Sequence, residues 1–70
     1  MNNTDEIKVW QTQSAEHKVA GVLMLDKVSF SRSEKDGLVF TAPEWYVEKL
    51  GYRLITAYGC RKRPVFTEIK

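Results

Sequence analysis

The sequence is short of the features that usually hold a small domain together. It has one cysteine, Cys60, so no disulfide can form within the chain. It has one histidine, His17, and a single Cys and a single His cannot supply the four ligands of a structural zinc. A chain of 70 residues then depends on a thin apolar core, so we expect it to form a homodimer or to be bound to a partner.

Long hydrophobic runs are also missing. The longest uncharged apolar stretch, residues 19–25, is far shorter than the about 20 residues that cross a bilayer. The polar and acidic N-terminus lacks the apolar centre of a secretory signal. Together with the lone thiol, these absences predict a cytoplasmic protein with no membrane partner.

Motifs of enzymes and cofactor-binding proteins are absent as well. The sequence has no phosphate-binding glycine-rich loop, no paired-cysteine motif and no nucleophile elbow. The three cations after Cys60 favour its thiolate, but no second cysteine is present to resolve a redox cycle. We therefore predict a non-enzymatic domain with no catalytic residues, no metal and no cofactor. A small ribonuclease toxin that works with a few Arg, Lys and Tyr side chains remains a third alternative.

Short apolar segments separated by turn residues are what the chain does contain. Alternation and apolar runs predict strands at residues 7–11, 19–25, 27–32, 38–41, 52–58 and 64–69. The strongest turn signal is the pair Asp36-Gly37. Residues 1–6 are polar and are expected to be a disordered end.

One short helix is predicted at about residues 43–50. Thr41 and Glu44 have the spacing of a capping box, and Pro43 suits the first turn. Gly51 is placed to end the helix in a left-handed conformation. The expected fold is a single α+β domain over residues 1–70, in the order β-β-β-β-α-β-β, with a mostly antiparallel sheet or a partly open barrel.

Positive charge is concentrated in the C-terminal half. Residues 1–36 have five Lys and Arg against six Asp and Glu, whereas residues 37–70 have six against three. Residues 49–67 contain no acid, and their cations are Lys49, Arg53, Arg61, Lys62 and Arg63. Such asymmetry predicts an anionic partner, DNA or RNA, and a nucleic-acid-binding regulator.

The expected contacts lie at the tip of a C-terminal hairpin. Arg61, Lys62 and Arg63 would contact phosphates there, with Arg53 and Lys49 in support. Tyr52 and Tyr58, on one face of the expected strand 52–58, would add stacking. The alternative is a solvated turn, with both tyrosines packed into the core.

The tryptophans favour a different class of partner. Trp45 falls on the polar side of the predicted helix, beside Glu48 and Lys49, and exposed aromatic side chains often mark a protein interface. Trp10 is open to the same two interpretations, interface or packing. The second hypothesis is therefore a protein-binding inhibitor or adaptor of a host machine, of the kind that phages and plasmids encode.

The stretch GLVFTAPEWYVEKLGY resembles the core of the AbrB-type swapped-hairpin DNA-binding family. The similarity rests on Gly37, Val39, Pro43, Leu50 and Gly51 and on the two strands expected after them. It covers residues 37–70, about half of the chain. The resemblance implies an interlocked dimer that binds DNA or an antitoxin partner through basic residues of the hairpin layer.

Overall fold

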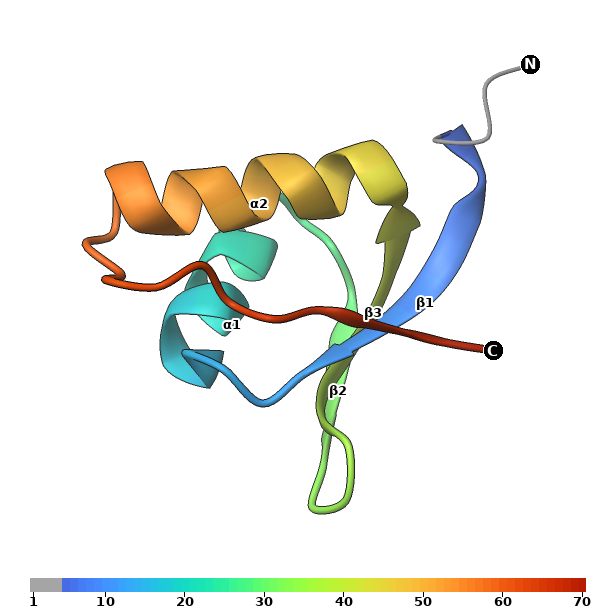
Figure 1. The fold of residues 1–70 in the computed structure, drawn as a ribbon. Coiled ribbons are helices and arrows are strands. Elements are labelled where there is room, and N and C mark those ends of the chain that lie inside the picture. Colours follow the sequence, from blue (N-terminus) through green and yellow to red (C-terminus); the bar gives the residue numbers. More distant parts are fainter. Residues whose placement is uncertain (1–4) are drawn as a thin grey trace.

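The computed structural model describes residues 5–70 and shows an α+β fold built on a four-stranded sheet (Figure 1). In chain order the elements are β1 (Ile7–Thr12), α1 (Glu16–Leu25), β2 (Phe30–Ser33), β3 (Gly37–Pro43), α2 (Glu44–Thr56) and β4 (Thr67–Ile69). The sheet is antiparallel throughout, in the order β2-β3-β1-β4. This is the split β-α-β topology of ferredoxin-like domains. The predicted α+β class and antiparallel sheet are confirmed, whereas the predicted element order with one helix is wrong.

Residues 19–25 form the second half of helix α1 and not a strand. A continuous apolar run does not distinguish a buried strand from a buried helix, and here the burial has helical spacing. Val19, Val22 and Leu23 are fully buried, whereas Met24 and Leu25 remain 68% and 69% exposed. Only one side of this run therefore meets the core.

Helix α2 continues well beyond its predicted end. Leu50 and Leu54 are fully buried one turn apart, so the apolar stripe runs through residues predicted to be a strand. Gly51 lies inside the helix, and its backbone is not left-handed. A Cβ at this position would lie 3.0 Å from Nε of Arg63. Gly51 thus allows the close approach of an arginine and does not cap the helix.

The start of α2 also differs from the prediction. Pro43 occupies the N-cap position with an extended backbone, and no side chain caps it. Thr41 lies in β3, two residues earlier, so the predicted capping box with Glu44 is wrong. Further along, a loop connects α2 to the short strand β4, and the predicted C-terminal hairpin is wrong too.

The core lies between the two helices and one face of the sheet (Figure 1). Its buried apolar residues are Trp10, Val19, Ala20, Val22, Leu23, Leu38, Phe40, Ala42, Val47, Leu50 and Leu54. Trp10 is only 7% exposed, and its indole N–H donates a 2.9 Å hydrogen bond to the Ala42 carbonyl. Of its two interpretations, packing is therefore the correct one. No described element covers the opposite face of the sheet.

Two sequence expectations concern the ends and the membrane. The disorder predicted for residues 1–6 falls outside the described residues at positions 1–4, and residues 5 and 6 directly precede β1. Among residues 5–70, neither helix has the length and apolar character needed to cross a bilayer.

The contact of Gly51 with Arg63 predicts a substitution effect that depends on the background. Gly51→Ala gains helix propensity, but in the parent protein it must displace Arg63. In an Arg63→Ala background the same change should stabilise the fold by about 0.5–1 kcal/mol. Urea unfolding of the four proteins of this double-mutant cycle measures the coupling.

Gly21→Ala is the matched control for that cycle. Gly21 is an exposed helical glycine of α1, and a Cβ there meets nothing within 4 Å. It should stabilise the fold equally with or without Arg63. Equal effects of Gly51→Ala in the two backgrounds would contradict the proposed contact.

Candidate interaction surface

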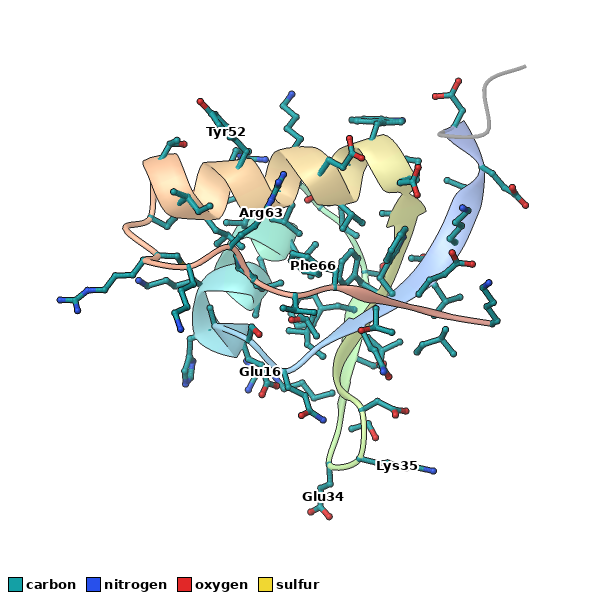
Figure 2. All side chains as sticks on the ribbon, in the orientation of Figure 1. Glu16, Glu34, Lys35, Tyr52, Arg63 and Phe66 are labelled. Carbon is teal, nitrogen blue, oxygen red and sulfur yellow. The ribbon has the colours of Figure 1, made fainter. Side chains whose placement is uncertain are left out.

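The side of α2 that faces away from the core carries two aromatic residues, with the exposed Glu48 and Lys49 between them. Trp45, Lys49 and Tyr52 have i, i+4 and i+7 spacing, so they lie on one side of the helix. Trp45 is 46% exposed and Tyr52 is 65% exposed. Figure 2 shows Tyr52 pointing away from the sheet. We call these three residues the outer-helix face.

The position of Trp45 is fixed by the neighbouring Tyr46. The two rings meet edge to face, with centroids 6.1 Å apart and an interplanar angle of 79°. Tyr46 is half-buried, and its hydroxyl donates a 2.6 Å hydrogen bond to Oδ2 of Asp26. Burial and this hydrogen bond to a carboxylate raise the pKa of Tyr46 well above its usual value. The ring of Trp45 therefore packs against a neutral tyrosine that is hydrogen-bonded to Asp26.

Asp26 joins the end of α1 to the first and last turns of α2. Its Oδ2 accepts a second hydrogen bond, from Nη1 of Arg53 at 2.7 Å. The hydrogen bond from Arg53, with a smaller contribution from Tyr46, lowers the pKa of the Asp26 carboxyl. Arg53, predicted to contact nucleic acid, is thus engaged inside the fold.

Arg63 is partly engaged as well. It reaches α2 from the loop before β4 (Figure 2), and its Nη2 donates a 3.1 Å hydrogen bond to the backbone carbonyl of Glu48. The remaining predicted contacts are Lys49, Arg61 and Lys62, all exposed. The salt bridges among residues 5–70 are Arg53–Asp26 and Lys8–Glu68, so none of these three cations forms a salt bridge, although Lys49 lies close enough to Asp26 to help lower the pKa of its carboxyl.

The predicted stacking pair is not brought together. Tyr52 is on the exposed side of α2, whereas Tyr58 lies beyond the end of that helix and packs against the core. Cys60 also packs against the core, and its N–H donates a 3.0 Å hydrogen bond to the Leu54 carbonyl. The sequence prediction places Tyr52 in a strand, so it does not put Tyr52 on the same side of a helix as Trp45. Their i, i+7 spacing was the available signal.

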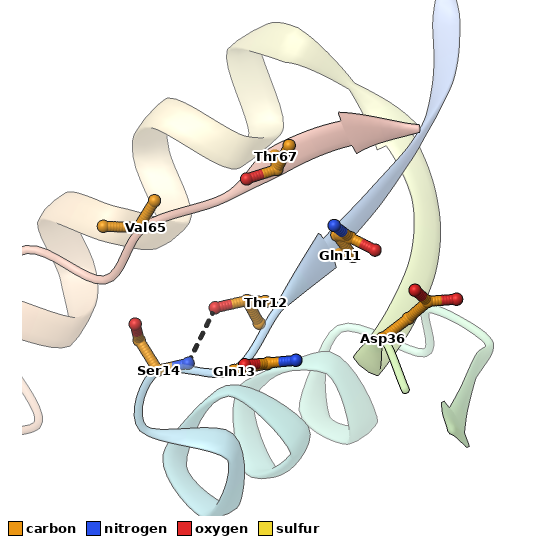
Figure 3. Close-up of a pocket in the computed structure, with 7 residues that line it drawn as sticks. All are labelled: Gln11, Thr12, Gln13, Ser14, Asp36, Val65 and Thr67. Carbon is orange, nitrogen blue, oxygen red and sulfur yellow. Dashed lines mark hydrogen bonds between the residues drawn. The ribbon is translucent and has the colours of Figure 1, made fainter. Parts of the chain in front are cut away.

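Several hollows lie away from the outer-helix face, and two of them border the loops around β4. The first, of about 320 Å³, is polar and lies at the end of β1 (Figure 3). It is lined by Gln11, Thr12, Gln13, Ser14, Asp36, Val65 and Thr67, and Oγ1 of Thr12 accepts a 3.1 Å hydrogen bond from the Ser14 N–H. Asp36 is the sole ionisable group among these lining residues, so no acid–base pair is assembled there.

The second hollow, of about 530 Å³, lies between α2 and the segment that leads to β4. It is lined by Trp10, Glu44, Val47, Glu48, Arg63, Pro64 and Phe66. Its charged residues are Glu44, Glu48 and Arg63, and Arg63 already donates a hydrogen bond to the backbone of α2. Within the described part of the chain, no three His, Cys, Asp or Glu side chains are grouped as metal ligands.

Comparisons with protein families, with curated proteins and with solved structures gave no match to this chain. The AbrB-type resemblance accordingly stays a prediction, although the segment expected to form its hairpin consists of the end of α2, a loop and β4. Function has to be argued from the exposed side chains themselves.

The Asp26 cluster predicts a pH effect on stability. Because the folded-state pKa of Asp26 is lowered, its contribution is complete above its usual pKa of about 3.9. That contribution is lost as the pH falls through the folded-state value. Asp26→Asn should cost about 1 kcal/mol at pH 7, since the pair is partly exposed, and should flatten the decline below about pH 4.

Urea unfolding at a series of pH values from neutral to strongly acidic measures this effect. Glu34→Gln is the control, because Glu34 lies at the tip of the β2–β3 hairpin, far from α2 (Figure 2). Parallel pH profiles for the parent and Asp26→Asn would show that ionisation of Asp26 does not stabilise the fold.

Proposed function

We propose that this protein is a non-enzymatic binding domain that docks on another protein through the outer-helix face, as an inhibitor or adaptor. The observation that carries the proposal is the exposure of Trp45 and Tyr52 on one side of an anchored helix. Aromatic residues of this kind dominate the energetics of protein interfaces.

The spacing of the outer-helix face suits a groove in the partner. Seven residues of helix span about 10.5 Å, so the two aromatic rings are two turns apart. Anchors at i, i+4 and i+7 are characteristic of helix-in-groove recognition. Because Tyr46 holds Trp45 in place, less conformational freedom would be lost on binding.

The charges around this face indicate the rim of the partner surface. Lys49 and the exposed Glu48 both lie between the two aromatic residues, and Arg61 and Lys62 extend from the loop after α2. These cations form no salt bridge within residues 5–70. An apolar groove bordered by carboxylates would complement them and would increase the rate of encounter.

Nucleic-acid binding is the second candidate, and the same three cations favour it. Lys49, Arg61 and Lys62 are available for phosphates, and Tyr52 is available to stack on a base. Four-stranded RNA-binding sheets stack bases on aromatic residues of their open face. The open face here has Val9 and Val39 on its central strands, so recognition would depend on the cations.

The decisive substitution for the first proposal is Trp45→Ala. It should weaken binding to the protein partner by about 30-fold or more, as expected for a buried aromatic anchor. Val65→Ala is the matched control, because Val65 is 67% exposed in the loop before β4. Calorimetry with the partner purified from nuclease-treated lysate measures both. Equal loss of affinity in the two variants, or none in either, would contradict the proposal.

The second candidate predicts a different dependence. The double change Arg61→Ala with Lys62→Ala should reduce the slope of log affinity against log salt by about two units. Lys18→Ala with Lys35→Ala, exposed cations on α1 and the β2–β3 turn, should change it less. Titration of random duplex and single-stranded oligonucleotides at low salt measures this. No binding at about 50 μM protein would remove nucleic acid as a partner.

A further inference from the structure

The charged residues of the strands lie on the face of the sheet that the helices cover, and not on the open face. Residues paired across antiparallel strands share a face. Lys8, Arg32 and Glu68 are the charged residues of the strands. Their cross-strand partners are Ala42, Leu38 and Trp10, which are buried under the helices. All three charges are therefore on the helix-covered side, where they can reach water only at its rim.

None of the strand residues on the open face is charged, and Asp36, in the turn before β3, lies at its edge beside Gln11 and Thr67. The strand residues of this face are Ile7, Val9, Gln11, Ser31, Ser33, Gly37, Val39, Thr41, Pro43, Thr67 and Ile69. This neutrality is notable in a chain of which 29% is charged. The apolar members are contiguous, because Val9 pairs with Ile69 and Ile7 pairs with Pro43.

This face keeps uncharged polar residues, as a solvated sheet face does, and it differs from a face that meets only water in having no charged strand residue. Solvated faces of antiparallel sheets are polar, and depletion of charge is the compositional mark of an interface centre. The strands of this chain do contain Lys, Arg and Glu, so neutrality on one side reflects placement and not a lack of charged residues.

A neutral face is well suited to contact its own copy. A two-fold axis brings each group near its equivalent, so a charge close to the axis would meet a charge of the same sign. Among the strand residues of the open face, moreover, there is no Trp, Tyr or Arg to anchor a foreign protein and no charge to attract one.

We propose that the open sheet face is an isologous interface between two copies of this chain, packed sheet against sheet around Val9, Val39 and Thr41. The four strands have six, four, seven and three residues, and at about 4.8 Å between strands and about 3.4 Å per residue they cover a projected area of the order of 330 Å². This is small beside the about 800 Å² per partner of a standard interface, so the dimer should be weak. The proposal does not depend on the function of the outer-helix face.

Thr41→Lys tests the interface without entering the core. Thr41 is exposed on the central strand β3, so the variant should fold, and each copy would place a new charge near its equivalent. Sedimentation equilibrium should show a dissociation constant raised about tenfold or more. Tyr52→Lys adds the same charge to the outer-helix face and should leave the dimer intact. Mixing Thr41→Lys with Thr41→Glu chains should restore association.

A second measurement uses the unmodified protein. Amide chemical shifts in a dilution series should change in β1, β3 and β4 and not along α2. A wild-type chain that stays monomeric at about 1 mM would overturn the proposal. So would concentration-dependent shifts confined to α2, or unchanged dimerisation of a folded Thr41→Lys variant. Loss of the protein partner on Trp45→Ala, or its absence, leaves all of these outcomes unaffected.

Discussion

The sheet of this protein buries only one of its two faces, and the rest of the structure depends on that constraint. β1 and β2 are both antiparallel to β3, so they are parallel to each other, and the same holds for β3 and β4 around β1. Connections between parallel strands are right-handed. The connection from β1 to β2 and the connection from β3 to β4 run in opposite directions along the sheet, and they start from strands that are antiparallel to each other. Both helices therefore lie on the same side of the sheet (Figure 1). Within residues 5–70, no element covers the opposite face.

Helix α2 uses each of its sides for a separate contact. Val47, Leu50 and Leu54 enter the core, whereas Tyr46 and Arg53 bind Asp26 at the end of α1. On another side, Gly51 lets the Arg63 side chain lie against the helix. With three sides held, the outer-helix face is presented on a rigid support, and rigid presentation reduces the entropy cost of binding.

The sequence predicted those elements whose signal is local. Alternation indicated β1 and β3, and the Asp36-Gly37 turn joins β2 to β3, where Gly37 has a φ of 76°. Helix α1 was missed because an apolar run fits both a strand and a helix. The second half of α2 was missed because Gly51 resembles a helix end unless its contact with Arg63 is known.

The candidate site shows the same division between local and distant signals. The exposure of Trp45 followed from its place on the polar side of a helix, which is a local property. The engagement of Arg53 and Arg63 did not, because their acceptors lie 27 and 15 residues away in the chain. A run of cations in a sequence therefore overstates the charge available to a ligand. The three cations that form no salt bridge, Lys49, Arg61 and Lys62, are too few to hold an extended polyanion at physiological salt without help from other contacts.

A second copy joined through the open face would double both the cations and the aromatic anchors, with the two outer-helix faces pointing away from each other. Two weak contacts on one target would then add through effective concentration, which favours a repeated or multivalent partner over a single isolated site.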